Sequence, residues 1–148
     1  MASQEDIRTY PNRPFIGVGV VVWSGEQVLL VRRGKPPRQG DWSIPGGAQH
    51  LGETIIEAAM REVREETGLE IVVTGLLDVI DFIDRDEQSD VRYHYTLVDM
   101  MADAVSGTPR PGDDVAEVAW VHPNDIDSYR LWTETSRIIR LAAEKRRD

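Results

Sequence analysis

The chain has no cysteine, which excludes disulfide bonds and metal sites built from thiolates and fits a reducing, cytoplasmic compartment. Basic residues are outnumbered by acidic ones. The chain has 17 Lys and Arg against 26 Asp and Glu, which gives a net charge of -9. This balance argues against partners such as a nucleic-acid polymer or an anionic membrane surface. A polyanionic small molecule would therefore need a metal ion or a local basic patch in order to bind.

Long hydrophobic runs are missing as well. The longest one covers residues 18–23 and is far shorter than the roughly 18 residues that a membrane span requires. We therefore expect neither membrane insertion nor export. A chain of 148 residues with 41% hydrophobic side chains can bury one core, so we expect a single domain over residues 1–148.

The order of apolar and turn-forming residues predicts strands before and after a helix. Residues 15–23 and 27–33 are β-branched and apolar, and the turn between them contains Gly25, so they predict a β-hairpin. Gly and Pro residues over 34–42 predict a loop that leads into a short extended piece. Further strands are predicted over residues 69–83 (with a break at Gly75), 91–102 and 115–121. The first two of these should pair antiparallel across an acidic turn.

Two helices complete this order. The first begins at Thr54, which can form a capping box with Glu57, and ends at Gly68. Its predicted buried stripe consists of Ile56, Ala59, Met60, Val63 and Thr67. The second helix covers residues 131–145 and places Leu131, Thr135, Ile138 and Ala142 on one face. Together these elements predict a mixed α/β sandwich around one sheet.

The first helix carries three glutamates, Glu62, Glu65 and Glu66, at positions i, i+3 and i+4. A helix brings such side chains to one face, with β-carbons about 5–6 Å apart, where like charges cost stability unless something neutralises them. Mg²⁺ is suited to this task because it takes carboxylate oxygens together with waters and phosphate oxygens. The cluster therefore predicts a metal site that is open on one side.

Two interpretations of this cluster remain open from the residues alone. The acids can belong to a solvated surface helix, with part of their charge paired internally, since Arg61 and Arg64 follow Glu57 by four and seven residues. Gly46 and Gly47 favour the metal site instead. Glycine lets a backbone carbonyl approach an ion and lets the loop turn back over the helix.

The stretch from Gly47 to Leu69 resembles the signature of the Nudix hydrolases. That signature is Gly, five residues, Glu, seven residues, Arg, Glu, an aliphatic residue, any residue, Glu, Glu, any residue, Gly and an aliphatic residue. Its defined positions are filled here by Gly47, Glu53, Arg61, Glu62, Val63, Glu65, Glu66, Gly68 and Leu69. The strand order on both sides is similar to the Nudix α/β/α sandwich around a mixed β-sheet, so the resemblance extends to nearly the whole chain.

The resemblance implies hydrolysis of a nucleoside diphosphate linked to another group, by attack of water on a phosphorus. The implied ligands of Mg²⁺, or of Mn²⁺ in its place, are the Gly46 carbonyl, Glu62, Glu65 and Glu66. Either Glu62 or Glu65 is also a candidate to activate the water. Glu53 and Arg61 match the pair that braces the loop against the helix.

Many family members use a further acid from outside the signature as a ligand or a base. The candidates here are Asp113 and Asp114, and the alternatives in the acidic turn are Asp84, Asp86 and Glu87. We prefer Asp113 or Asp114, with an ordinary role in the loop as the other interpretation.

Candidate substrate contacts also lie outside the signature. Arg32 and Arg33 end a predicted strand, and one of them is expected to face phosphate, to which Arg can donate two parallel hydrogen bonds. The other should point to the opposite face of the strand. Trp42 is a candidate for stacking on a base, and packing in the core is the alternative.

The chain as a whole resembles small bacterial ADP-ribose pyrophosphatase-like members of the family. The proline that accompanies the signature in many ADP-ribose hydrolases is absent, because no proline occurs between residues 75 and 108. The overall resemblance makes ADP-ribose or a related sugar nucleotide the leading substrate, whereas the missing proline leaves a nucleoside triphosphate as the alternative.

In two further interpretations the protein is not an enzyme. A nucleotide-sensing module would keep the fold without cleaving its ligand, but the complete set of carboxylates argues against it. A scaffold that forms a homodimer through the C-terminal helix is the weaker one.

Overall fold

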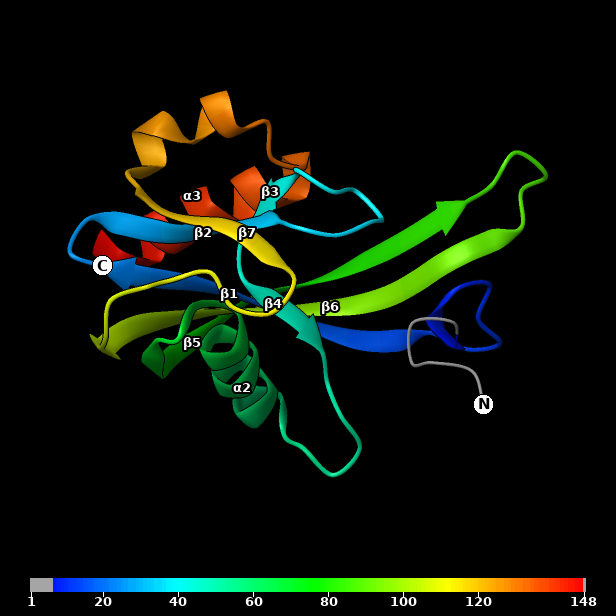
Figure 1. Ribbon diagram of the computed structural model, residues 1–148, viewed down its shortest axis with the longest axis horizontal. Coiled ribbons are helices and arrows are strands. Elements are labelled where there is room, and N and C mark those ends of the chain that lie inside the picture. The colour runs from blue at the N-terminus through cyan, green and yellow to red at the C-terminus, as the bar shows by residue number, and fades with distance from the viewer. Residues whose placement is uncertain (1–6, 148) are drawn as a thin grey trace.

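A seven-stranded mixed sheet forms the centre of the fold, in a computed structural model that describes residues 7–147 (Figure 1). The strands are β1 (Phe15–Ser24), β2 (Gln27–Arg33), β3 (Trp42–Ser43), β4 (Gly46–Ala48), β5 (Glu70–Arg85), β6 (Val91–Ser106) and β7 (Val115–Val121). Neighbours follow the order β3-β2-β1-β6-β5, with β4 paired to β1 and β7 paired to β2. The β1–β6 pair is parallel and the other pairs are antiparallel.

Strand β1 changes its neighbour along its length. Its end, Trp23 and Ser24, pairs with the start of β2, whereas Gly17 to Gly19 pair with β4. The approach of β4 requires glycine, because a β-carbon on Gly46 would lie 2.1 Å from the Val18 carbonyl oxygen. The glycine pair that precedes the signature helix is therefore built into the middle of the sheet.

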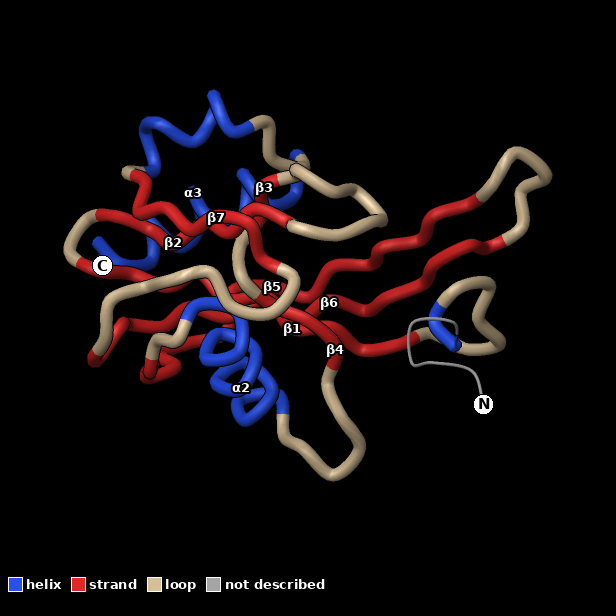
Figure 2. The backbone as a smooth tube through the Cα atoms, in the orientation of Figure 1, coloured by secondary structure: helices blue, strands red, loops and turns tan. Residues whose placement is uncertain are grey.

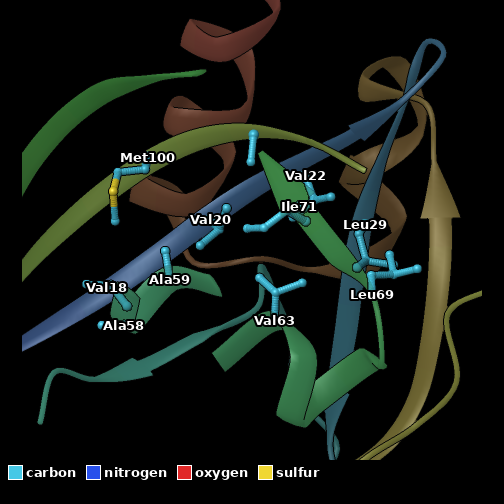
Figure 3. Packing of buried hydrophobic residues seen from close by; sticks show 11 residues of the cluster. Val18, Val20, Val22, Leu29, Ala58, Ala59, Val63, Leu69, Ile71 and Met100 are labelled. Carbon is cyan, nitrogen blue, oxygen red and sulfur yellow. The ribbon is translucent and has the colours of Figure 1, made fainter. Parts of the chain in front are cut away.

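Helices cover both faces of the sheet and form the predicted α/β/α arrangement. Helix α2 (Ile55–Thr67) packs on the face where β1 places Val18, Val20 and Val22 (Figure 3). Helix α3 (Thr133–Arg147) and the 3-10 helix η1 (Pro123–Tyr129) pack on the opposite face. The alternation of β1 side chains between two cores explains why its sequence is apolar throughout.

Both predicted ends of α2 are confirmed. Thr54 and Glu57 form a capping box, and Gly68 ends the helix in the left-handed conformation with φ of 76°. The predicted buried stripe was wrong at Ile56, whose side chain is 49% exposed. Ala58 is buried instead, because the helix lies with its small residues against the sheet and directs Ile56 to solvent.

Other element boundaries differ from the sequence-based expectation. Strand β5 continues through Gly75, where a register shift between Val73 and Gly75 absorbs the irregularity that we interpreted as a break. The 3-10 helix η1 was missed, although Pro123 at its start was a signal for it. Helix α3 begins at Thr133, two residues later than expected. Within residues 7–147, no helix is both long and apolar enough to cross a membrane.

Ile139 tests how α3 is held on the sheet. Its side chain is fully buried among residues of β1, β2 and η1, so Ile139→Ala should lower the free energy of unfolding by about 2–5 kcal/mol. The measurement is urea unfolding followed by circular dichroism. Leu51→Ala is the control, because that side chain is fully exposed, and its effect should stay within about 0.5 kcal/mol. Equal effects of the two variants would contradict this description of the core.

Candidate active site

The backbone of β4 lies directly against two carboxylates of α2. Gly46 N–H donates to Glu66 Oε1 at 2.8 Å. Gly47 is so close to the helix that a β-carbon there would lie 2.5 Å from the Glu62 carboxylate. Because glycine has no side chain at either position, the carboxylates of α2 can lie directly against the backbone of β4.

Arg61 connects the loop after β4 to the helix. Its guanidinium donates to Glu53 at 2.7 and 3.0 Å, to the Ala48 carbonyl at 2.9 Å, and to Glu62 at 2.8 Å. A longer bond of 3.2 Å reaches Glu65. This pairing holds the pKa of Glu53 down, to about 2, chiefly through the hydrogen bonds from Arg61. The planar fork of arginine thus joins loop and helix at several points.

The predicted pairing of Glu57 with Arg61 and Arg64 was wrong. Glu57 accepts from Thr54 N–H in the helix cap, and Arg64 donates to Glu70 at 2.7 and 2.8 Å. Arg61 lies on the side of the helix that faces the glycine loop, where partly buried acceptors are available to it.

The side chains of Glu62 and Glu66 are partly buried. Burial raises the pKa of Glu66 to about 8, although the Gly46 N–H and the charge of Arg33 favour its ionised form. Burial also raises the pKa of Glu62, against the opposing effect of Arg61. Among residues 7–147, no three Asp, Glu or His side chains lie close enough together to hold one metal ion. Three carboxylates, those of Glu53, Glu62 and Glu65, nevertheless surround one guanidinium, and that of Glu66 lies against the Gly46 backbone.

The loop between β6 and β7 covers the C-terminal end of α2 (Figure 1). Its backbone N–H groups donate to the last carbonyls of the helix, in the pairs Arg110 to Thr67 (3.0 Å), Gly112 to Glu66 (2.8 Å) and Asp113 to Glu65 (3.2 Å). A β-carbon on Gly112 would lie 1.9 Å from the Glu65 carbonyl oxygen, so this contact also requires glycine. Sequence reasoning missed this docking, and the Pro-Gly pair at 111–112 was the signal for a close turn.

This loop brings one pair of candidate acids to the helix. Asp113 is exposed beside the last turn of α2, while the Asp114 carboxylate pairs with Lys35 at 2.7 Å. The acidic turn lies elsewhere, at the outer end of the β5–β6 hairpin (Figure 2). There Asp84 pairs with Arg92 and Asp86 accepts from Tyr10 and from the turn backbone, while Glu87 is exposed.

The candidate substrate contacts are engaged within the protein. Arg32 donates to the Gly40 carbonyl and to Glu117, each at 3.0 Å, and Arg33 donates to the Pro37 carbonyl. Both arginines therefore hold the loop that follows β2. Trp42 packs edge-on against Tyr129, with 5.0 Å between ring centroids, beside the core under α3.

The sequence did not lead us to predict one buried acid, Asp99. Asp99 of β6 is 6% exposed and lies so close to Gly19 that a β-carbon there would approach Asp99 Oδ1 to 2.4 Å. Burial raises the pKa of Asp99 to about 6. An acid directly between Val98 and Met100, inside an apolar stretch, was the available signal.

Comparisons with known proteins identify the family of the chain. The family model described as NUDIX domain matches residues 13–142. The chain is 34% identical to an ADP-ribose pyrophosphatase of Methanocaldococcus jannaschii, over 80% of this chain and 75% of that one. It is 32% identical to the nucleoside triphosphatase NudI of Escherichia coli, over 69% and 76%.

A solved structure shows the same arrangement. The MutT NUDIX hydrolase from Burkholderia pseudomallei superimposes with a TM-score of 0.76 at 28% identity, covering 88% of this chain and 98% of that one. The family match, the relatives and the fold therefore agree on one family. The chain belongs to the Nudix hydrolases, enzymes that cleave pyrophosphate bonds in nucleotide derivatives.

Proposed function

We propose that the protein is a Mg²⁺-dependent hydrolase of a nucleoside diphosphate derivative, with ADP-ribose or a related sugar nucleotide as its substrate. The observation that carries the proposal is the pair of partly buried carboxylates, Glu62 and Glu66, held against glycine backbone within an intact signature. The name of the archaeal relative, ADP-ribose pyrophosphatase, supports the choice of substrate.

The donor set fits a hard divalent cation. Burial without enough positive charge raises the pKa of both Glu62 and Glu66, and a bound cation would favour their ionised forms. All the donors are oxygens, which Mg²⁺ and Mn²⁺ accept. We assign the cation to Glu62, Glu65, Glu66 and the Gly46 carbonyl.

The residues of the chain divide the remaining tasks. Glu53 and Arg61 hold the loop against α2, so that the carboxylates keep their positions when a polyanion approaches. Glu62 or Glu65 accepts the proton of the attacking water, and Asp113, exposed beside the same helix turn, is the further acid that we assign to the site. When bound, Mg²⁺ supplies charge neutralisation for the diphosphate and lowers the pKa of a coordinated water.

A nucleoside triphosphate is the second candidate substrate. It is favoured by the similarity to the nucleoside triphosphatase of Escherichia coli and by the absence of proline between residues 75 and 108. The products separate the two functions, because a sugar nucleotide yields a nucleoside monophosphate and a sugar phosphate, whereas a triphosphate yields pyrophosphate or phosphate.

Substrate panels test the proposed chemistry. ADP-ribose, other sugar nucleotides, dinucleotides and nucleoside triphosphates are incubated with Mg²⁺, and products are separated by ion-exchange chromatography. The double variant Glu65→Gln, Glu66→Gln should lose activity by about 10²-fold or more. Glu57→Gln is the matched control on the same helix, because glutamine preserves the capping box, and it should retain activity. The proposal fails if no substrate is turned over faster by the wild type than by the double variant.

The burial of Glu66 predicts a pH dependence of stability in the absence of metal. Its pKa is about 8 in the folded chain, above the ordinary 4.5, so the stabilisation from its proton is complete below about pH 4.5 and is lost as pH rises towards 8. In EDTA, Glu66→Gln should therefore be more stable than the wild type near pH 8, and this gain should shrink towards pH 5.

Thermal unfolding at several pH values measures this difference. Adding Mg²⁺ should raise the melting temperature of the wild type, and Glu66→Gln should reduce that increase. Glu57→Gln, whose carboxylate lies in the exposed helix cap, should follow the wild type in both experiments. A gain in stability for Glu66→Gln that is the same at pH 5 and pH 8 would contradict the assigned burial.

A further inference from the structure

One loop closes the end of α2. An α-helix ends with carbonyls that have no partner within the helix. In α2 the loop between β6 and β7 supplies donors to three of them, which are the carbonyls of Glu65, Glu66 and Thr67. We call residues 110–114 of this loop the clasp. All three donors are backbone N–H groups, so their positions depend on the path of the chain.

Two of these carbonyls belong to residues that we assign to the cation. Glu65 and Glu66 lie in the last turn of α2, which ends at Thr67. Helix ends fray, and the partial negative charge at a C-terminal end disfavours acidic side chains. The two carboxylates therefore lie where an isolated helix would hold them least firmly.

The clasp opposes both effects. Its N–H groups add positive partial charge at the negative end of α2, and each hydrogen bond restrains one carbonyl of the last turn. Mg²⁺ demands nearly ideal octahedral geometry, so its affinity is sensitive to the positions of its ligands. A helix end that is held in place before the cation arrives binds it without a further cost of ordering.

Gly112 determines how closely the clasp approaches the helix. A β-carbon there would lie 1.9 Å from the Glu65 carbonyl oxygen and 3.0 Å from the carbon of that carbonyl. Both atoms belong to backbone, so no side chain can turn aside to make room. Any larger residue at this position must therefore move the clasp or the last turn of α2.

The far end of the clasp is fixed to β2. The Asp114 carbonyl accepts from the Gly34 N–H at 2.7 Å, and the Asp114 carboxylate pairs with Lys35 at 2.7 Å. The next residue, Val115, is paired with Arg33 in the sheet. The clasp is therefore held at both ends, and it connects a strand of the sheet to the last turn of α2.

We infer that the clasp is a positioning element for the cation site and that Gly112 is the positioning residue through which it acts. The clasp holds the carbonyls of Glu65 and Glu66, and this fixes the directions from which the two carboxylates reach the ion. Gly112 has no side chain, so it acts only through the helix backbone that it contacts. The inference rests on the proposed function, because it presupposes a cation at the acids of α2.

Binding of Mn²⁺ tests the inference without turnover. The full chain is freed of metal with EDTA, dialysed and titrated with Mn²⁺ in a calorimeter. Gly112→Ala should weaken Mn²⁺ binding by about tenfold or more, as is usual when groups that orient metal ligands are changed. An affinity equal to that of the wild type would overturn the inference.

Gly107→Ala is the matched control in the same loop. Gly107 has φ of 100°, and a β-carbon there would lie 3.3 Å from the Leu69 side chain, so alanine strains the loop. The atoms nearest to that β-carbon belong to Leu69 and Gly68 rather than to the glutamates. This variant should unfold at lower urea concentration and keep Mn²⁺ affinity within about twofold. Equal losses of affinity in both glycine variants would contradict a specific role of Gly112.

Hydrogen exchange tests the physical cause. In EDTA, Gly112→Ala should speed the exchange of the amides of residues 65–68 by about tenfold or more, whereas Gly107→Ala should leave them nearly unchanged. If these amides exchange in Gly112→Ala as in the wild type, the clasp does not hold the helix end.

Arg110→Pro is a second variant that leaves Gly112 in place. Proline has no N–H, so this change removes the hydrogen bond to the Thr67 carbonyl. It should weaken Mn²⁺ binding by about threefold, as expected for one hydrogen bond. This variant decides the question if Gly112→Ala does not fold, and an unchanged Mn²⁺ affinity in it would then exclude the inference.

Kinetics separate positioning from a loss of folded protein. Gly112→Ala should raise the Mg²⁺ concentration that gives half the maximal rate by about tenfold or more, and leave KM for the substrate at saturating Mg²⁺ nearly unchanged. A lower rate with the Mg²⁺ dependence of the wild type would refute the inference and leave the proposed function standing. Failure of the wild type to bind Mn²⁺ would contradict the proposed function itself, and the inference with it.

Discussion

The site depends on one guanidinium. Arg61 donates to Glu53 and Ala48 on the loop and to Glu62 and Glu65 on α2, so a single side chain connects the glycine loop to the helix of acids. Without it, several carboxylates would repel one another in a partly buried position, and the loop would lose its attachment to the helix. The exposed fraction of the Arg61 side chain is 20%, which limits screening by water and strengthens each of these pairs.

Close contact between backbone and helix is the second constraint. Gly47 lies against the Glu62 carboxylate at one side of α2, and Gly112 lies against the carbonyl of Glu65 at the end of the helix. Neither contact leaves room for a β-carbon. The first directs acids towards bare backbone, and the second supplies hydrogen-bond donors to helix carbonyls that otherwise have no partner. Both contacts hold α2 against neighbouring segments, and this keeps its carboxylates close together.

The sheet separates two packed cores. The face under α2 carries the carboxylates, whereas α3 and η1 cover the opposite face. Strand β1 belongs to both cores, because it pairs with β4 and β2 on one side and with β6 on the other, and its side chains alternate between the two faces. The position of the acids relative to the glycine loop therefore depends on the register of this central strand.

The sequence by itself determined the strands of the hairpin, the capped ends of α2 and the family signature, because all of these are local patterns of spacing and turn chemistry. The resemblance also implied the pair of Glu53 and Arg61, which the structure contains. Only the tertiary structure decided that Arg64 pairs with Glu70, and that the loop with Gly112 caps α2. It also brought Trp132, Phe82 and Arg38 together from three distant segments. Those contacts depend on strand register and on how helices pack over the sheet. Contacts between residues far apart in the chain produce no local pattern in the sequence from which they could be predicted.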